Sequence, residues 1–72
     1  MNQGIYAVIR EKNGSVCFYY KCHDHYGIYD KMMELTDSDH EISCDGASWC
    51  ELATVGEIYE FREGEIEIVD TN

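Results

Sequence analysis

Basic side chains are scarce in this chain of 72 residues. It has 5 Lys and Arg against 15 Asp and Glu, which gives a formal net charge of -10 at pH 7. Proteins that bind nucleic acid contact its phosphates with Lys and Arg, so a charge of this sign argues against direct binding of DNA or RNA. A strong negative field attracts positive charge, and the composition therefore favours a partner with a basic surface.

Long apolar runs are also missing. With tyrosine left aside, the longest run is three residues, as in 7–9, whereas a membrane-spanning helix needs about 20. Proline is absent, and no repeat, linker or low-complexity segment divides the chain. The start, Met1–Gly4, does not have the charged-then-apolar layout of a signal peptide. We therefore expect a cytoplasmic protein with no membrane segment.

The residues that are present suffice for one small domain covering 1–72. Hydrophobic residues make up 44% of the chain and include 6 Tyr, too many for a disordered acidic tail. A chain of this length buries only about 60% of its unfolded surface, so its stability is marginal unless a metal, disulfides or a partner chain adds to it. Of these, disulfides are not expected, because free thiols are the default for the 4 Cys in a reducing cytoplasm.

The first secondary structure that the sequence indicates is a β-hairpin. Two runs rich in β-branched and aromatic residues, Ile5–Glu11 and Val16–Lys21, flank Lys12-Asn13-Gly14-Ser15. Asn-Gly supplies the two positive-φ residues of a type I′ turn, so we predict a hairpin closed by that turn. Alternate residues of the first strand face opposite sides, and both sets are apolar, so the pattern does not choose which set faces the core.

Between His23 and Thr54 the hydrophobic period becomes helical. Ile28, Met32 and Leu35 are spaced for one face of a short helix. The segment 36–39 then supplies good N-caps for a second helix, predicted from about Ser38 to Ala53, with Gly56 as its stop. Its apolar stripe comprises Ile42, Gly46, Trp49, Cys50 and Ala53. A break at Gly46 is an alternative, because glycine costs about 1 kcal/mol relative to alanine inside a helix.

The end of the chain returns to strand. Glu57–Phe61 and Glu65–Val69 surround Arg62-Glu63-Gly64, which has the composition of a three-residue hairpin loop with Gly in the left-handed position. The predicted fold is therefore α+β: a small antiparallel sheet made of an N-terminal and a C-terminal hairpin, with one or two helices packed on one face.

Several residue types could in principle carry chemistry. Cys17, Cys22, His23 and His25 are of the kinds that bind zinc, but their spacings match no zinc motif, so we expect no cofactor and keep this set as an alternative. Asp37–Glu41 begins like a calcium loop but has Ile42 where the loop needs Gly. Nucleophilic catalysis would need Cys22 or Cys44 beside His40, and no catalytic motif supports it, so we do not expect an enzyme.

The remaining candidate is the acidic surface itself. Fourteen of the acids follow residue 22, where only two bases accompany them. A solvated surface normally mixes both signs, so this density favours carboxylates that stand in for a phosphate backbone in a basic groove. Tyr and Trp are enriched at binding hot spots, which adds two tyrosines to the candidates. The expected partner-binding residues are Tyr29, Asp30, Glu34, Asp37, Asp39, Glu57, Tyr59, Glu60, Glu63, Glu65 and Glu67.

The segment Ala47–Phe61, followed by Glu65–Val69, resembles the ending of many small proteins from phages and mobile elements of low-GC Gram-positive bacteria. In size and acidity the chain is similar to phage anti-CRISPR and anti-restriction proteins, several of which imitate DNA. The resemblance implies a phage-encoded inhibitor in a bacterial host cell that blocks a nucleic-acid-binding site of a defence complex. The alternative is a zinc-stabilised or oligomeric interaction module, for instance a homodimer.

Overall fold

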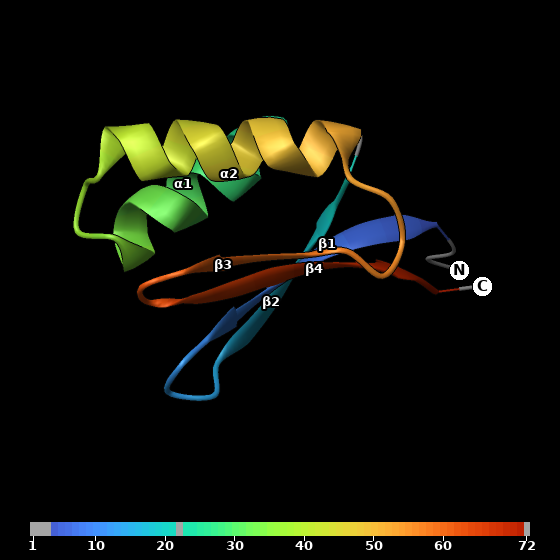
Figure 1. Cartoon of the computed structure of the whole chain (residues 1–72), viewed down its shortest axis with the longest axis horizontal. Coiled ribbons are helices and arrows are strands. Elements are labelled where there is room, and N and C mark those ends of the chain that lie inside the picture. The colour runs from blue at the N-terminus through green and yellow to red at the C-terminus, as the bar shows by residue number, and fades with distance from the viewer. Residues whose placement is uncertain (1–3, 22, 72) are drawn as a thin grey trace.

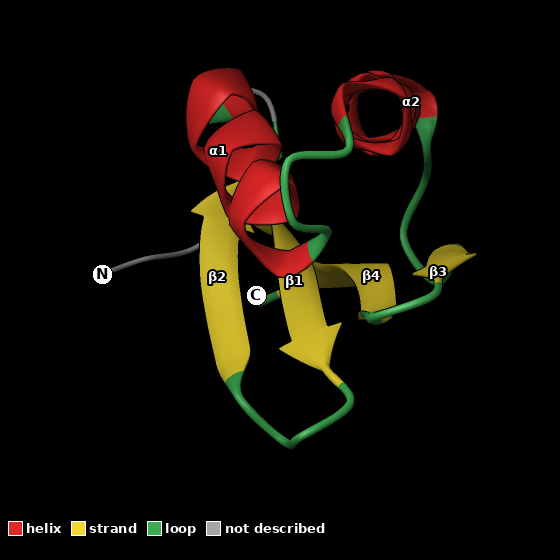
Figure 2. Cartoon of the chain, turned by 90° about the vertical axis from the view of Figure 1, so that its left-hand side faces the viewer, coloured by secondary structure: helices red, strands yellow, loops and turns green. Residues whose placement is uncertain are grey.

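The computed structural model describes residues 4–21 and 23–71 as a four-stranded antiparallel sheet with two helices (Figure 1). The chain runs β1 (Ile5–Glu11), β2 (Val16–Tyr20), α1 (His25–Leu35), α2 (His40–Leu52), β3 (Ile58–Phe61) and β4 (Gly64–Asp70). The strand order is β2-β1-β4-β3, and both helices lie on one side of the sheet (Figure 2). The predicted α+β fold with two terminal hairpins is thus confirmed.

The core lies between the helices and one face of the two central strands. In β1 and β4, Ala7 pairs with Ile68 and Ile9 pairs with Ile66, and all four side chains are buried. Ile28 and Met32 of α1, and Ala47 and Cys50 of α2, complete the buried cluster. Ala7 and Ile9 therefore face the core. The sequence pattern alone did not choose between this set and the alternating one.

The turn of the first hairpin differs from the prediction. Gly14 has a φ of 101°, but Asn13 does not have a positive φ, so the turn is not of type I′. Gly14 N donates to the Glu11 carbonyl at 3.0 Å, and Glu11 N donates to the Ser15 carbonyl at 2.8 Å. This is a three-residue loop in which Gly occupies the left-handed position. The Asn13 side chain instead accepts from Ser15 N at 2.9 Å, a local bond typical of asparagine in turns.

In the second hairpin, Gly64 does not have the left-handed conformation that the sequence predicted. β3 and β4 are joined by Arg62 and Glu63 alone, and Gly64 pairs with Phe61 as part of β4 without a positive φ. A Cβ built on Gly64 would clash with the carbonyl oxygen of Arg10. Gly64 is therefore needed for the close approach of β1 rather than for a left-handed turn.

The helices begin and end close to the predicted positions. Asp39 is the N-cap of α2, where its Oδ1 accepts from Ile42 N at 3.1 Å. Ser38 has a φ of 69°, which excludes it from the helix. Gly46 does not break α2: it is buried, and a Cβ there would lie 2.7 Å from the Met32 methyl carbon, so glycine lets the helix approach α1. The helix ends at Leu52, four residues before Gly56, whose positive φ serves the turn into β3.

No helix in the described part of the chain is long and apolar enough to cross a membrane.

We predict that Gly64→Ala lowers the free energy of unfolding by about 2 to 3 kcal/mol, because the added methyl group meets rigid backbone of β1 rather than a flexible side chain. The control is Gly14→Ala, where a Cβ meets nothing within 4 Å and only the left-handed backbone is strained, at about 1 kcal/mol. Urea unfolding of both variants tests this. Equal losses for the two variants would show that the contact with Arg10 does not require glycine.

Candidate protein-binding surface

Among the described residues, no helix covers the face of the sheet that points away from α1 and α2 (Figure 2). We call it the open face. Because strand side chains alternate, the partners of the core residues identify its members. It has an aromatic patch on β1 and β2 and an acidic patch on β3 and β4. The aromatic patch consists of Tyr6, Val16, Phe18 and Tyr20, and the acidic patch consists of Glu60, Glu65 and Glu67.

The aromatic patch is built around Tyr6. Its ring stacks on Tyr20 with the centroids 4.7 Å apart and meets the edge of Phe18 at 6.2 Å. Tyr6 is buried by these neighbours, whereas Phe18 is 60% exposed and Tyr20 is 39% exposed. A hydrogen bond with Tyr20 raises the pKa of Tyr6 to about 12, and burial adds to the shift. The stacked rings of Tyr6 and Tyr20 and the exposed ring of Phe18 therefore form one continuous aromatic surface.

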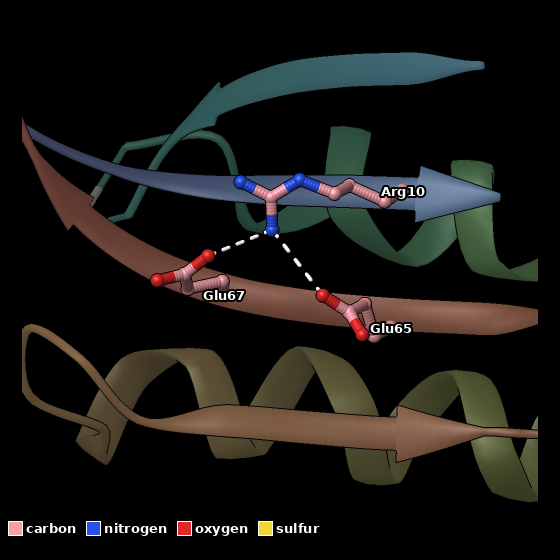
Figure 3. Close-up of polar contacts among 3 residues, drawn as sticks. All are labelled: Arg10, Glu65 and Glu67. Carbon is pink, nitrogen blue, oxygen red and sulfur yellow. Dashed lines mark hydrogen bonds and ion pairs between the residues drawn. The ribbon is translucent and has the colours of Figure 1, made fainter. Parts of the chain in front are cut away.

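The acidic patch surrounds one arginine (Figure 3). Arg10 Nη1 donates to Glu67 Oε1 at 2.7 Å and to Glu65 Oε2 at 3.3 Å, and the three residues come from the adjacent strands β1 and β4. The hydrogen bond to Glu67, more than the bond to Glu65, raises the pKa of Arg10 above its usual value. These side chains are one third exposed, so the pairs contribute little to stability and serve mainly to fix the carboxylates in place.

Glu60 is the least compensated member of the acidic patch. It is exposed on the edge strand β3 and pairs directly with Glu65 on β4. Like charges placed directly opposite each other in a sheet are destabilising. Among the described residues, no ion pair joins Glu60 to a base, and Arg10 contacts the other two carboxylates. Glu60 and Glu65 are thus a like-charge pair that Arg10 offsets on the Glu65 side only.

A shallow hollow opens beside Glu60 at the end of the sheet where the two hairpin turns meet. It has a volume of about 370 Å³, and the two turns are joined by a hydrogen bond from Lys12 N to the Glu63 carbonyl at 3.1 Å. The hollow is large enough to admit a side chain. Its lining residues are Arg10, Glu11, Lys12, Glu60, Phe61, Gly64 and Glu65.

The eleven residues expected to bind a partner do not lie on one surface. Three of them form the acidic patch, and Glu63 lies in the turn beside it. Asp30 and Glu34 are on α1, in the opposite layer, and Asp37 and Asp39 are in the turn between the helices. Three of the acids outside the acidic patch have local partners: Asp39 caps α2, Glu34 Oε1 accepts from Lys31 Nζ at 3.2 Å, and Glu57 Oε1 accepts from Thr54 N at 2.7 Å.

Tyr29 and Tyr59 are packed against the core cluster rather than projecting as free anchors. Tyr59 faces the helices, with its ring 5.5 Å from that of Trp49, and donates to Asp45 Oδ2 at 2.9 Å. Burial, and then the hydrogen bond to Asp45, raise the pKa of Tyr59 to about 12. Trp49 is likewise half-buried against the core.

Sequence reasoning did not single out the exposed residues of the open face, Phe18, Tyr20 and Ile58. One feature of the sequence indicated this patch. Both alternating sets of β1 are apolar, which is typical of a strand in a sheet that carries hydrophobic side chains on both faces.

The residues considered for zinc binding and for nucleophilic catalysis lie on β2, in the connection that follows it, and on the helices. Cys22 lies outside the described residues. Cys17 is on the helix side of β2, and within the described ranges no three His, Cys, Asp or Glu side chains gather as metal ligands. His25 Nδ1 lies 3.2 Å from Glu51 Oε1 without the geometry of a hydrogen bond. The second pairing considered from sequence, Cys44 with His40, is present on α2.

Comparisons with protein-family models, with curated proteins and with solved structures gave no match to this chain.

We predict that stability falls as the pH rises through the alkaline range. Burial raises the pKa of Cys50 and of Tyr59 to about 12 each, so the folded state holds protons that the unfolded chain has already lost. Both groups stabilise the folded state fully at a pH below their ordinary pKa values, which are 9.0 for the thiol and 10.0 for the phenol. This contribution to the free energy of unfolding is lost as the pH approaches 12.

Urea unfolding at a series of pH values measures this loss. Tyr59→Phe should flatten the decline between pH 10 and 12, and tyrosinate absorbance of the folded variant should lack one late step near pH 12. An unchanged slope in Tyr59→Phe would show that this phenol does not hold its proton through the fold.

Proposed function

We propose that this protein is a small inhibitor that binds a basic protein surface through the open face of its sheet. The partner surface is a nucleic-acid-binding groove of a bacterial defence complex, such as a CRISPR effector, and the inhibitor acts inside the host cell of a phage that encodes it. Its carboxylates take the place of nucleic-acid phosphates, and the exposed aromatic patch supplies apolar contact.

The acidic patch is the observation that supports this proposal best. Glu60 and Glu65 repel each other in the isolated protein, and a Lys or Arg of the partner placed between them would replace repulsion with attraction. The hollow beside Glu60, which three carboxylates and the two bases Arg10 and Lys12 line, has room for such a side chain. A groove built for nucleic acid presents several bases on a concave surface, and those bases suit carboxylates held on a rigid sheet.

The aromatic patch adds what charge alone does not supply. Interfaces place Tyr, Trp and Phe at their centre and charges at the rim, because screened charges steer association while buried rings hold the complex. Phe18 at 60% exposure is available for that role without unfolding any part of the sheet. The two patches lie side by side on one face, so a single partner surface can contact both.

We predict opposite effects of Glu60→Lys on folding and on binding. The substitution removes the repulsion with Glu65, so the free energy of unfolding should rise by about 0.2 to 1 kcal/mol. Association with the partner should slow by about tenfold at low salt, because the steering charge on the contact face is reversed. Purified RNA-guided nucleases and restriction enzymes are the partners to screen, by inhibition of DNA cleavage and by association kinetics.

The matched control is Asp30→Lys, which changes the net charge equally but lies exposed on α1, in the other layer. It should slow association only slightly. Equal slowing by both variants would assign the effect to overall charge rather than to the open face. Nucleic acid should also compete for the partner, and a partner that holds this protein and its DNA or RNA together with unchanged affinities would refute the mimicry.

A second candidate function is a homodimeric module, and the edge strand β2 favours it. Glu11 N donates to the Ser15 carbonyl, and Lys21 N donates to the Ile5 carbonyl. Hydrogen-bonded pairs alternate with non-bonded pairs along an antiparallel ladder, so the amides of Val16 and Phe18 point away from β1. β2 has no charged residue or proline of the kind that blocks edge pairing. It is also the strand farthest from the acidic β3, so two copies joined along β2 keep their acids apart.

Sedimentation over a range of concentrations tests the dimer. We expect self-association that Val16→Pro abolishes, because proline removes an outward amide without breaking a bond to β1. Phe61→Leu, on the helix side of the other edge strand, should leave it intact. A wild-type chain that stays monomeric up to its solubility limit would exclude this candidate and leave the inhibitor proposal untouched.

A further inference from the structure

The open face of the sheet holds a second, small hydrophobic cluster. Tyr6 and Val8 of β1 are only 8% and 1% exposed, yet neither belongs to the core cluster beneath the helices. On the open face, Tyr20 pairs with Tyr6 and Phe18 pairs with Val8. An antiparallel sheet that is covered on one side normally carries polar residues on the other. This cluster therefore resembles a second core whose covering layer is missing, and Phe18 remains 60% exposed on it.

The charges of the open face lie on one side of this cluster. The exposed strand β2 carries no charged residue, whereas Glu65 and Glu67 lie on β4 and Glu60 lies on β3. Arg10, on β1, stands between the aromatic patch and the acidic patch and offsets part of the acid. Because the strand order is β2-β1-β4-β3, the two patches form parallel strips that follow the strands. The apolar neighbours of the acidic patch on its own two strands are Val69 and Ile58.

The lengths of the two strips match those of a short helix. The five residues of β2 span about 17 Å, which is the length of about 11 helical residues, or three turns. Glu65 and Glu67 are two residues apart on one strand, so their Cα atoms are about 7 Å apart. Residues at i and i+4 of a helix are about 6 Å apart along its axis. A helix that lies along the strands can therefore place two successive bases against these two carboxylates.

We propose that the open face binds an amphipathic α-helix of the partner, with apolar residues against the aromatic patch and Lys or Arg against the acidic patch. The helix would complete a three-layer arrangement, in which α1 and α2 cover one side of the sheet and the partner's helix covers the other. Apolar contacts hold the helix, and the acidic patch sets its orientation, since its basic flank must lie over β4 and β3.

This inference rests on the proposed function for the identity of the partner, and it names the part of that partner which contacts the open face. A second copy of this chain is a poorer occupant. With a net charge of -10, each copy would bring its own carboxylates to an acidic surface. A basic helix brings the opposite charge, together with the apolar side that Phe18 and its neighbours require.

The test uses three synthetic peptides of about 18 residues, long enough to form a helix on the sheet. The first has leucines at the i, i+3, i+4, i+7 spacing and lysines elsewhere. The second has glutamate in place of lysine, and the third is a scrambled form of the first with no amphipathic period. Amide chemical shifts of the ¹⁵N-labelled full chain locate the binding site, and a titration gives the Kd. We expect the first peptide to shift residues of β1, β2 and β4 and to bind at least tenfold more tightly than the other two.

Variants of the two patches separate apolar contact from charge. Phe18→Ser should weaken binding of the first peptide roughly tenfold, because it removes the exposed ring at the centre of the contact. Its control is Leu52→Ser, which removes a side chain that is 86% exposed on α2, in the other layer, and should leave the Kd unchanged. Val16→Thr, which keeps a β-branched residue in β2, should weaken binding less, and it replaces Phe18→Ser if thermal unfolding shows that this variant does not fold.

The acidic patch should act on affinity through charge alone. Glu60→Gln should weaken binding about two- to threefold at low salt and little at high salt, as expected for one exposed carboxylate. Asp30→Asn, which removes the same charge from α1, should have a smaller effect.

The inference is overturned if the scrambled or the glutamate peptide binds as tightly as the first, or if the shifts fall on α1 and α2. It is equally overturned if a folded Phe18→Ser or Val16→Thr binds as the wild type does. Inhibition of a nuclease without binding of the helical peptide would refute this inference alone. Binding of the peptide without inhibition of any nuclease would refute the proposed function and leave the helix site in place.

Discussion

The pairing of β1 with β4 is the interaction on which the rest of the structure depends. It joins the two ends of the chain over seven residue pairs, Ile5 with Asp70 through Glu11 with Gly64. On one side it assembles the aliphatic floor of the core, and on the other it brings Arg10 between Glu65 and Glu67. Because these partners are more than fifty residues apart, the pairing forms only after nearly the whole chain has closed into a loop.

The same pairing explains how much of the fold could be read from the sequence. Each hairpin is a local feature, and alternation with Asn-Gly or Glu-Gly turns indicated both. The turn details were wrong where a tertiary contact decided them: Gly64 is glycine because β1 approaches it, and no local pattern reports a neighbour from the other end of the chain. Gly46 is the same case in α2, where a packing contact with Met32 outweighs helix propensity.

The candidate site was only partly predictable for a related reason. Composition revealed the excess of acid but not its division between two layers, which separates Asp30 from Glu60. Tyr29 and Tyr59 looked like binding residues by type, yet their hydroxyls find partners in His40 and Asp45 and their rings cover the core. The exposed Phe18 was missed because only the sheet topology shows that no helix covers β2 on that side.

Charge and packing act against each other in this small domain. A core of mostly aliphatic residues must hold a net charge of -10, and some of the repulsion is concentrated at pairs such as Glu60 and Glu65. Moving one acid to the other face would relieve that pair without altering the core, so the fold does not require it. The proposed inhibitor function offers a reason for this pair, because a positive charge of the partner would turn its repulsion into attraction.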